Sequence, residues 1–300
     1  MLEELLVPLQ KRGHQVDVYL AKGPSGPVYD YRGLRVHRRG SDWHAAALDA
    51  DVLVTHLDQT SEVVGVASVL DKPVVQILHN THAPTKMWAN CKADLLVFNS
   101  EWMKADFGMD GLVVRPPVWA EDYNTYENSN KRGGYVTLVN SSYRKGGLMV
   151  SILAAMMPNV HFMILKGAYG EQLEPPLPNV RIDEHAAWDM ALVYNETSIL
   201  LMPSYYESWG RVGVEAMASG TPVIASPTPG LKESLDYAGI FADWEDVGAW
   251  KYHIERLLYD EDAYAKASSL AYNRSADLDP GPDIEAWIDA VERLSARVSS

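Results

Sequence analysis

Short apolar runs alternate with longer amphipathic stretches along most of the chain. This alternation of strand and helix is typical of α/β proteins, in which helices cover parallel sheets. The runs fall into two series, which predict two Rossmann-like domains. The first series comprises Val16–Leu20, Val52–His56, Val74–Leu78, Leu95–Phe98 and Leu112–Val114, and the second comprises Tyr135–Val139, His161–Leu165, Val180–Ile182, Ile199–Met202 and Val223–Ala225.

Proline and glycine mark the boundaries between these parts. Consecutive prolines in Arg115-Pro116-Pro117-Val118 stop both helix and sheet, and Asp279-Pro280-Gly281-Pro282 interrupts the chain again. We therefore predict a first domain over residues 1–117, a second over 118–282 and a final amphipathic helix within 283–300. The polar stretch 127–134 is expected to be a surface loop.

Composition narrows the possible functions. The chain has 300 residues, of which 47% are hydrophobic and 22% charged, as in ordinary globular proteins. Residues 151–300 hold 10 Lys and Arg against 23 Asp and Glu, a net charge of −13. Such a surface repels nucleic acid. The single cysteine, Cys91, excludes an intrachain disulfide and fits a reducing cytoplasm, and no apolar run approaches membrane-spanning length.

The segment from Pro203 to Ala225 predicts a loop, a helix and a strand that follow a buried strand. In a parallel sheet that loop lies at the carboxyl edge, where ligands bind. The helix amino terminus attracts anions. Glu207 stands in the loop and Glu215 one turn into the helix, where each carboxylate can accept hydrogen bonds from ribose or sugar hydroxyls. The alternative is that Glu215 only caps the helix and Glu207 is only solvated.

This segment resembles retaining glycosyltransferases of the GT-B fold, in the family 4 group with its Glu-x7-Glu motif. The resemblance rests on Pro203-Ser204, Glu207, and Glu215-Ala216-Met217-Ala218-Ser219-Gly220-Thr221-Pro222-Val223-Ile224-Ala225. It implies that the two domains face a cleft and that the C-terminal helix crosses back to the first domain. It also implies that Glu215 binds ribose, that Glu207 binds the transferred sugar and that backbone amides complete an anion site. Those amides belong to Gly210, Arg211, Val212 and Gly213.

A second element follows the strand Tyr135–Val139, in Arg144-Lys145-Gly146-Gly147. The glycines allow close backbone approach to a ligand, and Lys145 offers a mobile ammonium. This resembles the Lys-Gly element with which the family holds the donor diphosphate. The family often has an arginine six residues before this lysine, where this chain has Val139, so Arg144 or Arg211 is expected to replace it. The alternative is a solvated turn.

Histidines follow the predicted strand Val74–Leu78, in His79-Asn80-Thr81-His82. A histidine at a strand end can position an acceptor hydroxyl or relay its proton. The cleft histidine of the family matches His79 better than His82, and a structural role for both is the alternative. Ser100 follows the strand Leu95–Phe98 and is expected to cap the next helix.

Other charged clusters are weaker candidates. Asp260-Glu261-Asp262 and Asp277-Leu278-Asp279 have the spacing of a metal motif but lie in or beside helical sequence, so we expect no metal site and no cofactor. Four arginines of a predicted hairpin could contact an anionic acceptor or lipid headgroups, although a solvated hairpin is favoured. They are Arg32, Arg35, Arg38 and Arg39.

The resemblance implies a metal-independent transferase that moves a sugar, with retention, from a UDP- or GDP-linked donor to an unidentified acceptor hydroxyl. Two alternatives remain: a sugar-nucleotide-binding partner subunit with little turnover, and an epimerase of nucleotide sugars. Members of the family open with a strand and a glycine-rich turn, whereas here a helix marked by Leu2, Leu5, Leu6 and Leu9 comes first. We expect either a start further upstream or a first domain with two strands left unpaired.

Overall fold

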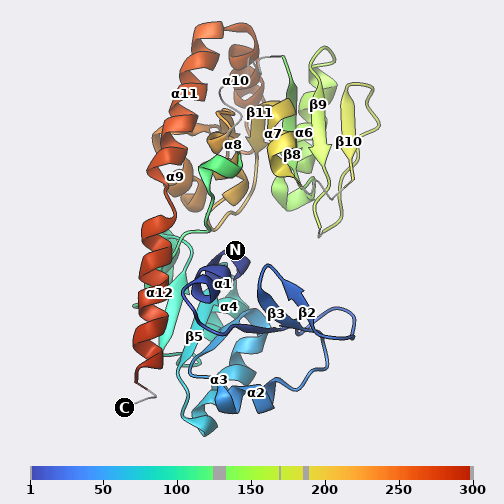
Figure 1. Ribbon diagram of the computed structural model, residues 1–300. Helices are drawn as coiled ribbons and strands as arrows, with labels where there is room; N and C mark the ends of the chain where they lie inside the picture. The colour runs from blue at the N-terminus through green and yellow to red at the C-terminus, as the bar shows by residue number, and fades with distance from the viewer. Residues whose placement is uncertain (1, 124–132, 169, 185–188, 298–300) are drawn as a thin grey trace. The chain divides into compact units, whose positions relative to one another are not determined.

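The computed structural model describes residues 2–123, 133–168, 170–184 and 189–297 (Figure 1). The chain divides into two compact units, which are Met1–Pro117 with Pro280–Ser300, and Val118–Asp279. The first is called unit 1 and the second unit 2. Residues 127–132 of the expected surface loop lie outside the described residues.

Unit 1 contains helices on both faces of short strands. The helices are α1 (Leu2–Lys11), α2 (Trp43–Asp49), α3 (Thr60–Leu70), α4 (Ala83–Ala89), α5 (Glu101–Phe107), α12 (Gly281–Ser295) and the 3-10 helix η1 (Leu57–Gln59). The strands are β1 (Asp17–Tyr19), β2 (Tyr29–Tyr31), β3 (Leu34–His37), β4 (Leu53–His56), β5 (Val74–Leu78), β6 (Leu95–Phe98) and β7 (Leu112–Val113).

The strands of unit 1 form two sheets. Strands β4, β5, β6 and β7 are parallel and adjacent in that order. A smaller sheet has the order β1-β3-β2, in which β1 is parallel to β3 while β2 and β3 form an antiparallel hairpin. The predicted strands of this unit are therefore present, and the arginine-rich segment is a hairpin as expected. Strands β1 and β4 each lie at one end of their own sheet.

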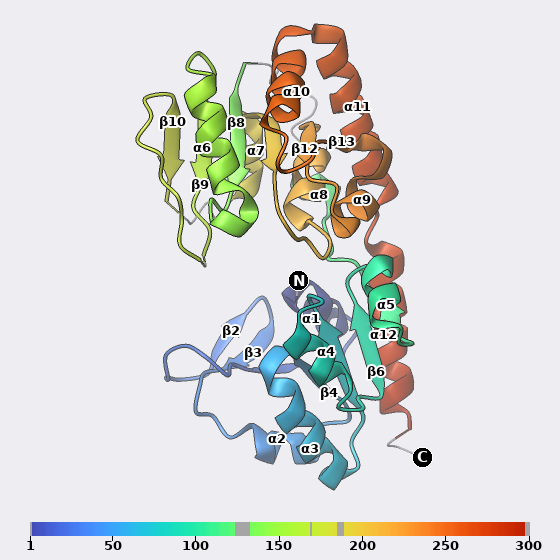
Figure 2. The ribbon, with the colours of Figure 1, turned by 180° about the vertical axis from the view of Figure 1, so that it is seen from behind.

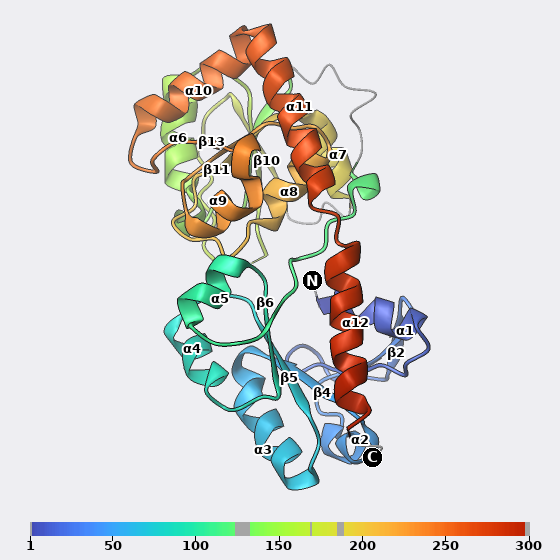
Figure 3. The ribbon, with the colours of Figure 1, turned by 90° about the vertical axis from the view of Figure 1, so that its left-hand side faces the viewer.

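The C-terminal helix completes the core of unit 1, as the fold class implied. Helix α12 packs beside α1 (Figure 3), and both contribute apolar side chains to one cluster. Trp287 of α12 is fully buried, and its indole Nε1 donates a hydrogen bond to the carbonyl oxygen of Leu5 at 2.9 Å. The carboxylate of Asp283, near the start of α12, accepts from the backbone and side chain of Arg115.

Unit 2 is larger and more regular. Its helices are α6 (Gly147–Met156), α7 (Met190–Glu196), α8 (Arg211–Ala218), α9 (Pro229–Leu235), α10 (Val247–Tyr259), α11 (Glu261–Asp277) and the 3-10 helices η2 (Ala120–Asp122), η4 (Tyr143–Lys145) and η5 (Asp236–Ala238). Its strands are β8 (Tyr135–Val139), β9 (Phe162–Leu165), β10 (Val180–Asp183), β11 (Thr197–Met202), β12 (Val223–Ala225) and β13 (Ile240–Phe241).

All six strands of unit 2 are parallel, in the order β10-β9-β8-β11-β12-β13. Strands β9 and β10 follow β8 in sequence and lie on one side of it. Strand β11, the next in sequence, lies on the other side of β8. The strand order therefore reverses between β8 and β11. In open α/β sheets, ligands bind outside the carboxyl ends of the strands at this reversal point.

Strand β11 lies at the centre of unit 2 and is buried along its whole length. Ile199 and Leu201 belong to the apolar cluster that includes side chains of α6 and α10, whereas Leu200 and Met202 belong to the cluster that includes side chains of α8 and α9. Figure 2 shows these four helices. A strand with two covered faces needs apolar residues at every position, which explains the uninterrupted apolar run in the sequence. The short edge strand β13 was not predicted. Among the described residues, no helix is both long and apolar enough to span a bilayer.

Trp287→Ala tests the contribution of α12 to unit 1. Removing a fully buried indole leaves a cavity and should lower the free energy of unfolding by about 3–5 kcal/mol in urea denaturation. Val69→Ala on α3, where the side chain is 85% exposed, is the control and should change it by less than about 0.5 kcal/mol. Equal effects of the two substitutions would contradict the packing of α12 on unit 1.

Candidate functional site

The predicted donor-side residues Lys145 and Glu207 meet at the reversal point of unit 2. Leu138 of β8 pairs with Leu201 of β11, so the loops that follow these strands leave the sheet side by side. Lys145 Nζ contacts Glu207 Oε1 at 2.5 Å, and the hydroxyl of Ser204 donates to the same oxygen at 2.9 Å. Both side chains are mostly buried, with 23% of Lys145 and 13% of Glu207 exposed.

The second carboxylate, Glu215, lies in α8 with both of its oxygens engaged. Arg211 Nε donates to Oε1 at 2.8 Å, and the hydroxyl of Tyr194 donates to Oε2 at 2.8 Å. Burial first, and then the charge of Glu215, raise the pKa of Tyr194 well above its ordinary value, so this phenol stays a donor. Tyr194 was not predicted, because the sequence pattern of α7 does not show which way the Tyr194 side chain points.

The amino terminus of α8 differs in detail from the expected row of amides. Gly210 precedes the helix with φ 91°, a left-handed conformation that favours glycine. The amide of Gly213 donates to the carbonyl of Gly210 at 2.9 Å, so it is already used within the first turn. A Cβ on Gly213 would lie 2.8 Å from Met202 Sδ. Gly213 therefore permits tight packing of α8 on β11, and the amides of Gly210, Arg211 and Val212 stay predicted anion donors.

Gly146 and Gly147 let the Lys145 loop pack against the protein itself. Gly146 has φ 89°, and a Cβ there would lie 2.3 Å from Pro203; a Cβ on Gly147 would lie 1.9 Å from the carbonyl oxygen of Ser141. Gly146 therefore allows the loop after β8 to contact the loop after β11, and Gly147 allows α6 to begin close to Ser141 of its own loop. Close approach of a ligand to these glycines stays a prediction. Arg144 is exposed on the same loop.

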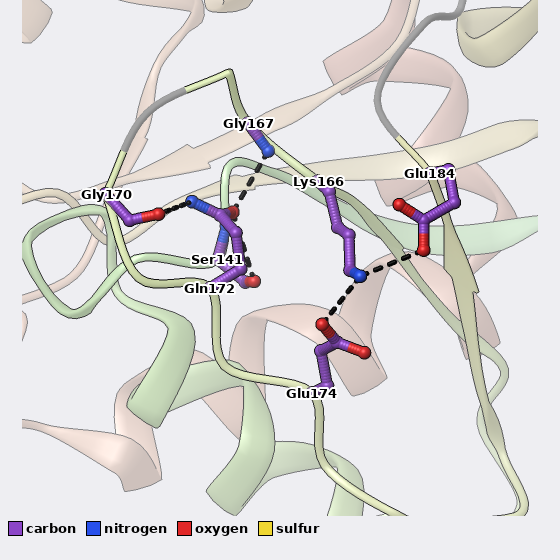
Figure 4. Close-up of polar contacts among 7 residues, drawn as sticks. All are labelled: Ser141, Lys166, Gly167, Gly170, Gln172, Glu174 and Glu184. Atoms are coloured by element: carbon purple, nitrogen blue, oxygen red, sulfur yellow. Dashed lines mark hydrogen bonds and ion pairs between the residues drawn. The ribbon is translucent and has the colours of Figure 1, made fainter.

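Gln172 holds the loops after β8 and β9 together, and no sequence pattern pointed to it (Figure 4). Its Oε1 accepts from the amides of Ser141 and Gly167 at 2.9 and 3.0 Å. Its Nε2 donates to the side chain of Asn140 and to the carbonyl of Gly170, both at 3.1 Å. One neutral side chain thus joins the loops after β8 and β9 at the carboxyl edge of the sheet.

Lys166 lies beside this network and contacts two carboxylates, Glu174 at 2.6 Å and Glu184 at 2.9 Å (Figure 4). These contacts, first with Glu174 and then with Glu184, raise the pKa of the Lys166 ammonium. Lys166 therefore stays charged and holds Glu174 and Glu184 together at this edge of the sheet.

In unit 1, the structure places His79 in a half-buried pair and His82 at the surface. His79 follows β5 and His56 ends the neighbouring β4, with His56 Nδ1 and His79 Nε2 3.1 Å apart. Burial first, and then the charge of His56, lower the pKa of His79 to about 4. His82 is exposed at the start of α4. His56 was missed, although two parallel strands that each end in histidine bring both rings to one edge.

The remaining sequence candidates have structural partners. Ser100 caps α5 by accepting from the amide of Met103, as predicted. Asp260 caps α11, and Asp277 at its other end accepts from the hydroxyl of Tyr237 at 2.7 Å. In the parts of the chain that the structure describes, no group of three or more His, Cys, Asp or Glu side chains could hold a metal ion.

The arginines of the β2–β3 hairpin are also engaged locally. Arg32 pairs with Glu3, and Arg35 pairs with Asp17. The guanidinium of Arg38 lies over the ring of Tyr29, 4.6 Å from its centroid. These contacts agree with the favoured interpretation of a solvated hairpin.

Solved structures resemble the whole chain. Sucrose-phosphate synthase from Thermosynechococcus elongatus aligns with a TM-score of 0.76 at 18% identity, over 99% of this chain and 92% of that chain. Anabaena HepE in complex with UDP-glucose aligns with a TM-score of 0.77 at 18% identity, over 97% and 95% of the two chains. The chain has the GT-B fold. At identities this low, the structural similarity establishes the GT-B architecture alone. The activity has to be argued from the site.

A family model matches part of the second half of this chain. Residues 184–274 match the family model of glycosyl transferases group 1, a range that includes both Glu207 and Glu215. D-inositol 3-phosphate glycosyltransferase of Mycolicibacterium smegmatis is 34% identical over 134 residues, which is 40% of this chain and 31% of that protein. The corresponding protein of Corynebacterium kroppenstedtii is 43% identical over 76 residues, or 25% and 17%. The chain spans about a third or less of these curated relatives.

The histidine pair predicts a specific pH dependence of stability. Because the pKa of His79 lies below its ordinary 6.5, protonation favours the unfolded chain. The contribution of neutral His79 to the free energy of unfolding should be complete above pH 6.5. It should be lost as the pH falls from 6.5 to about 4. We expect a loss on the order of 2 kcal/mol across this window, absent in His79→Gln and retained in the exposed control His44→Gln. An NMR titration of His79 with a midpoint near 6.5 would contradict this account.

Proposed function

We propose that the chain is a retaining glycosyltransferase that moves a sugar from a UDP- or GDP-linked donor to an acceptor hydroxyl. The observation that carries the proposal is the meeting of Lys145 and Glu207 at the strand-order reversal of unit 2, beside the amino terminus of α8. A cation, a carboxylate and a helix amino terminus at one sheet edge suit a phosphate that is joined to a sugar. The match of residues 184–274 to glycosyl transferases group 1 supports it.

In this proposal the donor replaces ion pairs that the protein makes by itself. Lys145 leaves Glu207 for the diphosphate, and the carboxylate of Glu207 then accepts hydrogen bonds from the transferred sugar. Arg144, Arg211 and the amides of Gly210, Arg211 and Val212 complete the anion site. Glu215 binds the ribose hydroxyls, with Tyr194 and Arg211 holding its carboxylate in place.

Catalysis would consist mainly of stabilising the leaving group. As the bond between sugar and phosphate breaks, negative charge grows on the diphosphate, where Lys145 and its neighbours are already placed. Attack of the acceptor from the leaving-group side gives retention and allows the diphosphate to take part in removing the acceptor proton. The mechanism requires neither a protein nucleophile nor a metal ion.

His79 is the proposed acceptor-side residue. Its low pKa keeps the ring neutral at physiological pH, so one ring nitrogen can accept a hydrogen bond while the other donates. His56 holds one of these nitrogens and thereby fixes the ring orientation. His82 remains a weaker candidate on the same segment.

A nucleotide-sugar-binding subunit with little turnover is the second candidate. Val139 at the end of β8 favours it, because an apolar side chain stands where the resembled family often carries a phosphate-binding arginine. An epimerase would also use this donor site, and release of free nucleoside diphosphate from the sugar nucleotide would argue against it.

The two carboxylates should have separable effects on ligand binding. Glu215→Gln should reduce the thermal stabilisation given by both UDP and UDP-glucose, because both contain ribose. Glu207→Gln should preserve the stabilisation by UDP and slow the turnover of UDP-glucose. GDP and GDP-mannose serve as the second ligand pair.

Glu255→Gln on the exposed face of α10 is the matched control and should change neither measurement. The melting temperature of each variant without ligand shows whether the fold survives. Equal losses of bare-nucleotide affinity in Glu207→Gln and Glu215→Gln would refute the division of roles.

Lys145→Ala should lower the rate of nucleoside diphosphate release by about a hundredfold or more, the scale for removing one preorganised electrostatic contact. The assay is run in excess EDTA, in which the activity of the unmodified protein should persist. Lys251→Ala, which removes a surface lysine of α10, should retain full activity. Full activity of Lys145→Ala, or loss of all activity in EDTA that Mn²⁺ or Mg²⁺ restores, would overturn the proposed diphosphate site.

A further inference from the structure

Three aromatic side chains gather at the carboxyl edge of unit 2, each from a different loop. Tyr143 comes from η4 after β8, Tyr205 from the loop after β11, and Trp244 from the turn after β13. The rings of Tyr143 and Tyr205 are stacked with centroids 5.6 Å apart and planes 26° apart. The rings of Tyr205 and Trp244 are 4.0 Å apart with planes inclined by 44°. We call these three residues the aromatic platform.

Much of the platform faces solvent. Tyr143 is 57% exposed and Tyr205 is 37% exposed, although both are large and partly apolar. Single exposed aromatic residues are ordinary, but a contiguous group of them beside a polar site is a common mark of a binding surface.

Backbone and side-chain contacts hold the platform in place. The amide of Tyr205 donates to the carbonyl of Arg144 at 3.0 Å, and the hydroxyls of Tyr205 and Tyr143 lie 3.2 Å apart. The turn that carries Trp244 is anchored by Asp243, whose carbonyl accepts from Trp250 Nε1 at 2.8 Å. Rigid rings lose little conformational entropy when a ligand covers them.

The platform continues directly from the Lys145–Glu207 pair. Tyr143 lies two residues before Lys145, and Tyr205 lies two residues before Glu207. Glu215 instead lies within α8, where it accepts from the hydroxyl of Tyr194 of α7. If Glu215 marks the ribose end of the donor, as proposed above, the platform lies toward the sugar end.

We propose that the aromatic platform binds a sugar ring by stacking. A pyranose has an apolar face of C–H groups, which can stack on an aromatic ring. It also has hydroxyl groups around its rim. Arg144 and Glu245 are exposed beside the rings and can bond to such a rim. The position of the platform toward the sugar end of the donor rests on the proposed function. Sugar stacking on the platform can be measured separately from donor binding.

The test is saturation-transfer NMR on the full chain in the presence of UDP. Its probes are methyl α-glucopyranoside, methyl α-mannopyranoside and methyl β-galactopyranoside. At least one of these sugars should receive saturation on the protons of one ring face. Tyr143→Ala and Trp244→Ala should weaken its binding about fivefold, or about 1 kcal/mol, the scale of one aromatic contact. Tyr143→Ala removes the most exposed ring and keeps the test valid if Trp244→Ala unfolds.

Tyr259→Ala, which removes a 67% exposed ring at the end of α10, is the matched control and should leave sugar binding unchanged. Absence of saturation transfer to all three sugars would overturn the proposal, as would equal weakening in Tyr259→Ala. An equal loss of UDP affinity in the platform variants would assign the rings to a nucleobase instead. If UDP fails to stabilise the protein while the sugar still binds, the proposed function is refuted. Sugar binding by the aromatic platform would then still be supported.

Discussion

The parallel pairing of β8 with β11 is the constraint on which the candidate site depends. Their register brings Leu138 beside Leu201, so two loops whose key residues lie 62 positions apart in sequence leave the sheet together. Strand β11 cannot slip by one residue, because Ile199 and Leu201 would exchange faces with Leu200 and Met202 inside two different cores. The contact between Lys145 and Glu207 is therefore a consequence of core packing. Gly146 then allows the two loops to approach to contact distance, because a Cβ there would collide with Pro203.

The charges at this edge are matched locally despite the acidic surface of unit 2. Lys145 pairs with Glu207, Arg211 with Glu215, and Lys166 with Glu174 and Glu184. Each partly buried cation thus has a carboxylate beside it, since an unpaired charge would be costly to bury. A ligand phosphate must compete with a carboxylate for these cations, and that competition favours a ligand able to use the released carboxylate as well.

The sequence predicted the elements better than the contacts between them. Buried strands such as β5 and β11 have uninterrupted apolar runs, whereas the two-residue strand β13 has too short a run to be recognised. His79 was chosen as a candidate because it directly follows a recognisable strand. Glu207 and Lys145 were chosen because each lies in the loop after such a strand, within a motif that resembles a known family. Gln172, Tyr194 and His56 were missed because their partners are fixed by sheet register and loop path. Gly213 shows the same limit, since its amide is used within the helix and its missing side chain admits Met202.

The path of the chain also bears on how the protein is made. Unit 1 is discontinuous, because α12 is separated from Pro117 by the whole of Val118–Asp279. A ribosome adding about 5–20 residues per second needs roughly ten to thirty seconds to translate that intervening stretch. During this interval the apolar face of α1, with Leu5, Leu6 and Leu9, has been synthesised while Trp287 and its neighbours in α12 have not. Unit 2 can fold as it emerges, but unit 1 must wait for α12, so the nascent chain presents an incomplete apolar surface to chaperones until that helix has been made.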